Sequence, residues 1–236
     1  KHHGRVPYYR GRLKGVARSM PTSSAADAVA ARLGISLYAT PTGWKWFGPL
    51  LESGMVQLCG EESFGQGGDY IGEKDAIFAA LYWLNILGAT GMTPGQVMRG
   101  LWDEYGRMFY SQYSYEGVDA DAAARIVGRM RGADLAGRNG IASLENIFYS
   151  DPATGEKSGW EGTQIKTDDG ARIFFRLSGT GTSGATMRFY IEKPERDPAK
   201  FGMDNREYLS GLSARAVEIF GIREAFGEEP KKTVAI

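Results

Sequence analysis

The chain has 236 residues, a hydrophobic fraction of 42% and 28 basic against 28 acidic residues, which indicates a soluble globular protein of one large or two ordinary domains. The formal net charge of zero argues against a nucleic-acid-binding surface over the whole molecule, and Cys59, the only cysteine, excludes an internal disulfide and a cysteine-based zinc site. No apolar run is long enough to span a membrane, and the sequence has no signal-peptide pattern. We therefore expect a cytoplasmic protein that binds neither nucleic acid nor membrane.

The start of the sequence is unusual for a domain. The first residue is Lys1 and not methionine, and the segment from Val6 to Lys14 is typical of a connection that leads into a strand. We therefore expect the chain to be a fragment of a longer protein.

In the first half of the chain, short strands alternate with helices. Strands are expected at residues 13–18, 35–39 and 55–59, and helices at 24–33, 44–51, 73–87 and 93–105. Pro94 occupies the favoured first position of the last helix. The helix at 73–87 is expected to bury Ile77, Leu81, Leu84 and Ile86. This order predicts βαβ units and a largely parallel sheet.

The composition changes after Gly106. A strand is expected at 108–115, a helix from Asp119 to about 131, a hairpin joining 163–166 to 172–177, and a final helix at about 206–220. We therefore predict two domains. Residues 1–105 form an incomplete α/β domain with a mixed, mostly parallel sheet, and residues 106–236 form an α+β domain with an antiparallel sheet.

A glycine-rich stretch at residues 176–188 reads Arg-Leu-Ser-Gly-Thr-Gly-Thr-Ser-Gly-Ala-Thr-Met-Arg. Glycines bring backbone N–H groups close to a ligand, hydroxyl residues add donors, and the two terminal arginines can each fork onto phosphate oxygens. The stretch therefore indicates an anion site, most simply for a phosphate ester. A glycine-rich hairpin turn without a ligand remains an open alternative.

The same stretch matches the dinucleotide-binding pattern at Gly179, Gly181 and Gly184. That pattern requires a following helix, whereas residues 186–191 have the β-branched and aromatic character of a strand. A phosphate-binding Walker loop also requires a lysine, and Ala185 follows Gly184 instead. Both nucleotide-binding interpretations are therefore rejected.

Four stretches in register resemble the phosphoglucomutase family, in the eukaryote-type branch of the alpha-D-phosphohexomutase superfamily. They lie at residues 15–23, 40–45, 59–65 and 176–188, and the resemblance covers essentially the whole chain. In that family four domains surround one cleft, and the first two carry a phosphoserine and a magnesium loop. Neither motif occurs in this sequence, so the resemblance implies most of a third domain and all of a fourth, with N-terminal domains missing.

The resemblance implies the C-terminal half of an enzyme that interconverts glucose 1-phosphate and glucose 6-phosphate. The reaction would pass through a phosphoserine and glucose 1,6-bisphosphate and would use Mg²⁺, whose ligands are absent here, so this chain alone is expected to be inactive. The implied site residues are Thr42, Glu61 and Ser63 for the sugar, Lys74 for electrostatic support, and Arg176, Ser178, Gly179, Thr180 and Arg188 for the phosphate that is not transferred.

Several residues also have plainer interpretations. Lys74 could be a solvated charge at a helix start, and Glu62 could be a structural carboxylate that holds its loop. Cys59 is expected to be a small buried hydrophobe, and Trp44 and Trp46 are expected in the core although they could stack on a sugar.

Two further points bear on function. Tyr70 and Gly72 replace a histidine and an arginine of many relatives, which puts the sugar preference in doubt. The alternative function is a non-catalytic phosphosugar-binding or scaffold protein derived from such an enzyme.

Overall fold

The computed structural model describes residues 2–132, 140–178, 185–226 and 233–235, and the chain forms two compact units. Unit one comprises Lys1–Arg107, Tyr149–Ser158 and Arg196–Pro198, and unit two comprises Met108–Phe148, Gly159–Glu195 and Ala199–Ile236. The predicted division into domains 1–105 and 106–236 stays a prediction, and the two short returns of the chain to unit one are not apparent from the sequence.

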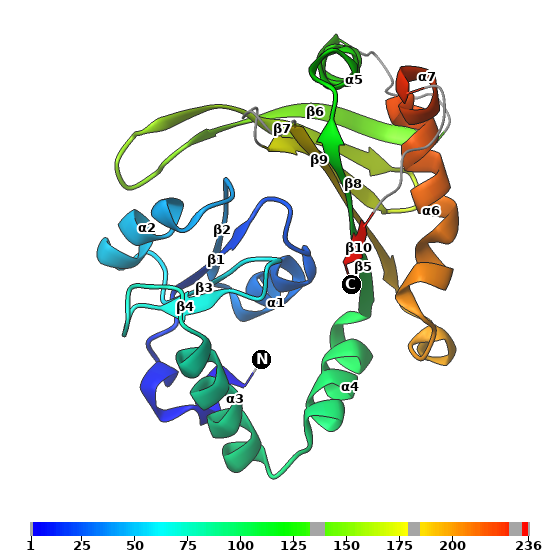
Figure 1. The fold of residues 1–236 in the computed structure, drawn as a ribbon. Helices are drawn as coiled ribbons and strands as arrows, with labels where there is room; N and C mark the ends of the chain where they lie inside the picture. The colour runs from blue at the N-terminus through cyan, green and yellow to red at the C-terminus, as the bar shows by residue number, and fades with distance from the viewer. Residues whose placement is uncertain (1, 133–139, 179–184, 227–232, 236) are drawn as a thin grey trace. The chain divides into compact units, whose positions relative to one another are not determined.

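Unit one contains a four-stranded sheet in the order β2-β1-β3-β4 (Figure 1). Strand β1 pairs in parallel with β2 and β3, and β3 pairs antiparallel with β4. The predicted mixed, mostly parallel sheet is therefore confirmed. The fourth strand escapes prediction because it is short and glycine-rich, a composition depleted in strands. The bounds are β1 Gly15–Ser19, β2 Ser36–Thr40, β3 Leu58–Gly60 and β4 Gln66–Gly68.

The predicted helix at 44–51 is wrong. The structure has a short 3-10 turn, η3 (Trp44–Trp46), followed by the separate helix α2 (Gly48–Glu52). Pro49 lies at the start of α2, and a proline cannot supply the N–H that a continuing helix would need there. Trp46, Phe47 and Leu50 are buried, which confirms that Trp46 is a core residue.

Helices α1 and α4 of unit one agree with the helices expected at 24–33 and 93–105. Helix α1 (Ala25–Leu33) ends at Gly34 in the left-handed conformation. Helix α4 (Pro94–Tyr105) begins with the predicted proline, preceded by a capping box in which Thr93 and Gln96 each bond to the other's backbone. Two 3-10 turns, η1 (His3–Arg5) and η2 (Pro7–Tyr9), precede β1.

Helix α3 (Ala76–Thr90) contradicts the prediction of a buried apolar side. None of its residues is buried: Ile77 is 72% exposed and Leu84 62% exposed. Leu81 is also exposed, and Ile86 is half-buried. The N-terminus of the helix is capped, because the Asp75 carboxylate accepts a hydrogen bond from the Phe78 N–H. An apolar helix face is therefore left without a covering element among the described residues.

Unit two contains a six-stranded sheet in the order β10-β5-β9-β8-β7-β6 (Figure 1). The pairs β10–β5, β7–β8 and β8–β9 are antiparallel, which confirms the predicted antiparallel sheet. The predicted hairpin turn is also confirmed, since the Gly170 N–H donates to the Thr167 carbonyl. The bounds are β5 Arg107–Val118, β6 Ile141–Ser150, β7 Lys157–Thr167, β8 Arg172–Ser178, β9 Ala185–Glu195 and β10 Thr233–Ala235.

Helices pack against this sheet through a large apolar core. Phe220 at the end of α6 contacts the rings of Phe175 on β8 and Phe189 on β9. Ile126 and Met130 of α5 are buried in the same cluster. The bounds are α5 Ala120–Gly132, η4 Pro198–Lys200, α6 Asn205–Phe220 and α7 Ile222–Phe226.

No single helix in the described ranges is long and apolar enough to cross a membrane. Helices α3 and α4 are long and apolar enough only when taken together, and their axes are bent by 81° at the break between them.

A buried ion pair links β8 to β9. Arg172 and Glu192 face each other in register, and Arg172 Nε donates to Glu192 Oε1 at 2.5 Å. Their side chains are only 9% and 2% exposed. Removing one partner of such a pair leaves an uncompensated buried charge.

We predict that Glu192→Ala lowers the free energy of unfolding by about 3 kcal/mol or more, measured by denaturant titration. The double variant Arg172→Met with Glu192→Met should recover most of that loss, because it leaves no buried charge. Equal stability of the single variant and the parent would contradict the assignment of a buried pair.

Candidate functional site

Glu61 connects three segments of unit one. It follows β3 directly, and its Oε1 accepts from the Gly43 N–H at 2.9 Å. Its Oε2 lies 3.4 Å from Lys74 Nζ. The side chain of Glu61 is 5% exposed, so these contacts hold a carboxylate in one orientation at the end of a parallel strand. In open α/β sheets this edge is where ligands bind.

Lys74 is not a free solvated charge. Besides Glu61, its Nζ donates to Ser63 Oγ at 3.2 Å, and its side chain is 40% exposed. The lysine thus connects both residues predicted to contact sugar hydroxyls. Thr42 directly precedes Gly43, whose amide Glu61 binds, so the structure brings Thr42, Glu61, Ser63 and Lys74 into one cluster. We call these four residues the Glu61 cluster.

Backbone geometry shapes the loop between β3 and β4. Gly43 has a φ of 120°, a value that L side chains rarely adopt, which explains a glycine beside Thr42. A Cβ on Gly65 would lie 2.0 Å from Lys74 Cε, so a larger residue there would displace the end of the lysine side chain. Phe64 has a φ of 61° and is 85% exposed. A left-handed phenylalanine is strained, and no sequence signal reveals it.

Cys59 lies at the base of this loop and is buried, as predicted. Burial raises the pKa of the Cys59 thiol to about 12, which keeps it protonated and unreactive at neutral pH. The Sγ–H donates to the Gly67 carbonyl on β4. The thiol therefore belongs to the packing of the sheet.

Arg176 and Arg188 lie directly opposite each other on β8 and β9, and Ser178 faces Thr186 two residues further along. Two like charges at directly opposed positions destabilise a sheet. Arg176 Nη1 and Arg188 Nε are both buried and have no hydrogen-bond partner in the part of the chain that the structure describes. Buried donors without a partner are rare in folded proteins, and here two of them meet on one pair of strands.

An anion between these side chains would satisfy both features. It would offset the repulsion of the two guanidinium groups and accept from their unpartnered N–H groups. We call Arg176, Ser178 and Arg188 the arginine cluster. The predicted contacts Gly179 and Thr180 lie outside the described residues. The strand predicted after the glycines is confirmed as β9, which supports the rejection of a dinucleotide loop.

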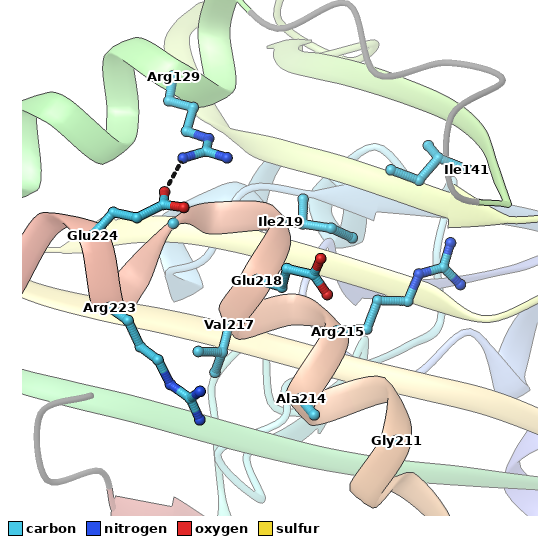
Figure 2. A pocket seen from close by; sticks show the side chains of 11 residues that line it. Arg129, Ile141, Gly211, Ala214, Arg215, Val217, Glu218, Ile219, Arg223 and Glu224 are labelled. Carbon is cyan, nitrogen blue, oxygen red and sulfur yellow. Dashed lines mark hydrogen bonds and ion pairs between the residues drawn. The ribbon is translucent and has the colours of Figure 1, made fainter. Parts of the chain in front are cut away.

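A separate hollow of about 840 Å³ lies in unit two among α5, α6 and α7 (Figure 2). None of the predicted site residues lines it. Figure 2 shows Arg129 paired with Glu224, and Arg223 pointing away from that pair. Its charged lining of three arginines and two glutamates is nearly balanced, which does not select an anionic ligand.

Among the residues that the structure describes, no group of three or more His, Cys, Asp or Glu side chains is placed to hold a metal ion. Glu61 accepts a hydrogen bond from the Gly43 amide and forms an ion pair with Lys74.

Comparisons with known proteins agree with this arrangement. The family model described as the C-terminal domain of phosphoglucomutase-1 matches residues 107–231, and that of the phosphoglucomutase/phosphomannomutase alpha/beta/alpha domain III matches residues 6–105. The chain is 45% identical over 224 residues to a phosphoglucomutase of Rhizobium radiobacter, covering 92% of this chain and 41% of that protein. It is 42% identical to a probable cytoplasmic phosphoglucomutase of Arabidopsis thaliana, covering 95% and 42%.

A solved structure is also similar. The open form of the exocytosis-sensitive phosphoprotein pp63/parafusin from Paramecium, a phosphoglucomutase, superposes with a TM-score of 0.87 at 38% identity, covering 94% of this chain and 40% of that one. The chain thus spans about two fifths of the length of the relatives that it matches.

We predict that Arg188→Met raises the free energy of unfolding of the ligand-free chain by about 0.5 kcal/mol at low ionic strength, because it removes a like-charge pair. Inorganic phosphate should raise the thermal midpoint of the parent and not that of the variant, at constant ionic strength. Lys166→Met, which removes an exposed cation on β7, is the matched control and should keep the phosphate effect. An equal effect of phosphate on all three proteins would contradict an anion site at Arg188.

Proposed function

Because the chain belongs to the phosphoglucomutase family, we propose that it is the C-terminal part of an enzyme that interconverts glucose 1-phosphate and glucose 6-phosphate. The observation that carries the proposal is the facing pair of arginines on β8 and β9, whose buried donors have no partner among the described residues. A phosphate ester supplies the oxygens that such a pair requires. Because the chain matches only part of its relatives, the activity is that of a longer protein.

In this proposal the residues of each unit have a separate role toward the hexose phosphate substrate. Arg176 and Arg188, with Ser178, Gly179 and Thr180, hold the phosphate that is not transferred. Each charge-assisted contact contributes about 1.5–3 kcal/mol, so the arginine cluster would supply much of the binding affinity. Glu61 and Ser63 receive the sugar hydroxyls, with Thr42 beside them.

The contacts of Glu61 are compatible with this role. A carboxylate offers about four lone-pair positions, and the described contacts from Gly43 and Lys74 use two of them. Lys74 lies next to Glu61 and Ser63, where its positive charge would offset charge on a moving phosphoryl group. Glucose 1,6-bisphosphate, the proposed intermediate, would present its second phosphate to the same arginines after it reorients.

The phosphoserine and the magnesium site are proposed to lie in domains outside this chain. Magnesium, when bound there, would neutralise charge on the phosphoryl group in transfer. This chain would then bind and orient the sugar without supplying the nucleophile, which is why we expect it to be inactive alone. Several plant relatives are named cytoplasmic, and we propose the same compartment for the enzyme.

The test joins this chain to the N-terminal part of the Rhizobium radiobacter relative. We expect the chimera to convert glucose 1-phosphate to glucose 6-phosphate, and Arg176→Ala to raise KM by about 10-fold or more, since one charged contact is lost. Lys166→Ala is the control and should leave the kinetics unchanged. A folded chimera that binds glucose phosphate but never turns it over would favour a non-catalytic phosphosugar-binding protein instead.

Helix α3 bears on the partner of this chain. Its exposed face continues into a hollow of about 300 Å³ lined mainly by apolar and aromatic residues, among them Tyr8, Phe78 and Tyr82. Monomeric soluble proteins rarely expose such a continuous apolar surface. We propose that the missing N-terminal domains cover it in the longer protein.

We accordingly expect the isolated chain to self-associate, and Leu81→Glu with Leu84→Lys to increase its monomeric fraction in light scattering. Phe148→Ser removes a comparably exposed apolar side chain from unit two and should have little effect. In the chimera, the double variant should lower the thermal midpoint. A monomeric isolated chain whose behaviour the α3 substitutions leave unchanged would contradict the proposal.

A further inference from the structure

Two adjacent glutamates of the loop after β3 have different partners. Glu61 contacts the Gly43 N–H and the Lys74 ammonium group. Glu62 contacts the turn between β1 and α1, where its Oε2 accepts from the Ser19 hydroxyl at 2.9 Å. The same oxygen lies 3.4 Å from Thr22 Oγ1. The two carboxylates therefore connect the loop to separate parts of unit one.

The Ser19 hydroxyl is a fixed anchor for Glu62. Ser19 is the last residue of β1 and is fully buried, and its Oγ lies 2.6 Å from Thr22 Oγ1. Hydrogen bonds to a charged acceptor are about twice as strong as neutral ones. A half-buried carboxylate held by two hydroxyls has little freedom to reorient.

The turn that carries these hydroxyls is itself held by Arg18. Its Nε and Nη2 form a two-point contact with the Asp27 carboxylate at 2.6 and 2.7 Å. Its Nη1 donates to the carbonyl oxygens of Ser19, Met20 and Thr22. The guanidinium thus fixes the turn through its carbonyl oxygens. The two parallel contacts to Asp27 add geometric specificity as well as strength.

The loop needs such support because its backbone is strained. Phe64 has a positive φ, and the Glu61 N–H donates to the Gly65 carbonyl at 2.8 Å across a tight turn. Strained conformations persist only where surrounding contacts determine them. The bonds of Glu62 to Ser19 and Thr22 tie this turn to the β1 side of the sheet, beyond the pairing of Arg18 with Gly60.

We infer that Glu62 is a positioning residue, which fixes the loop so that Glu61 and Ser63 point toward Gly43 and Lys74. The inference rests on the proposed function for its kinetic consequence, but the positioning itself does not depend on turnover. The Gly43 N–H, whose acceptor is Glu61 Oε1, is a direct reporter of where Glu61 lies.

The test measures amide hydrogen exchange by NMR in the chain and in its Glu62→Ala and Glu62→Gln variants. In Glu62→Ala, exchange at Gly43 and Glu61 should accelerate about 10-fold or more, while the amides of β1 keep their protection. Glu62→Gln keeps an acceptor for Ser19 and should retain most of the protection. Glu116→Ala, at an exposed site in unit two, is the control and should change neither amide.

Unchanged protection at Gly43 in Glu62→Ala would overturn the inference. If that variant unfolds, Ser19→Ala removes the same contact from the other side, and protection at Gly43 then decides between the same two outcomes. In the chimera, Glu62→Ala should lower kcat/KM about 10-fold or more with rescue by Glu62→Gln, because a small displacement of a substrate contact is costly. A parent chimera without activity would refute the proposed function, and the exchange result would still decide the role of Glu62.

Discussion

The register between β8 and β9 is the constraint on which unit two depends. Phe175 pairs with Phe189 and Leu177 with Met187, and because their side chains pack in or against the core, a shift by one residue would expose them. The same register places Arg176 opposite Arg188 on the other face. Burial of the apolar residues therefore holds two like charges together at directly opposed positions.

In unit one, the Glu61 cluster is assembled from segments far apart in the sequence. Thr42, Glu61 and Lys74 come from three loops, and a single carboxylate joins them through one backbone amide and one ammonium group. Glu62 attaches the loop after β3 to Ser19, and Arg18 holds the turn after β1 through its carbonyl oxygens. Two neighbouring carboxylates of this loop thus connect it to different parts of unit one.

Much of this architecture could be predicted from the sequence where local signals agree. Strand β1, helix α4 with its Thr93 cap, and the hairpin turning at Gly170 each follow from periodicity or turn chemistry. Strand β4 could not be predicted, because its glycines carry no strand signal. The burial of α3 was predicted wrongly, because an apolar stripe does not reveal whether the element that would cover it is present. The contacts of Glu61 and Glu62 depend on residues far along the chain, which no local pattern encodes.

The central claim is that the arginine cluster of unit two binds the phosphate of a hexose phosphate. It is tested most directly by a crystal structure of the chimera with glucose 6-phosphate bound. The account predicts phosphate oxygens within hydrogen-bond distance of both Arg176 and Arg188. A well-ordered sugar phosphate that contacts neither arginine would contradict it.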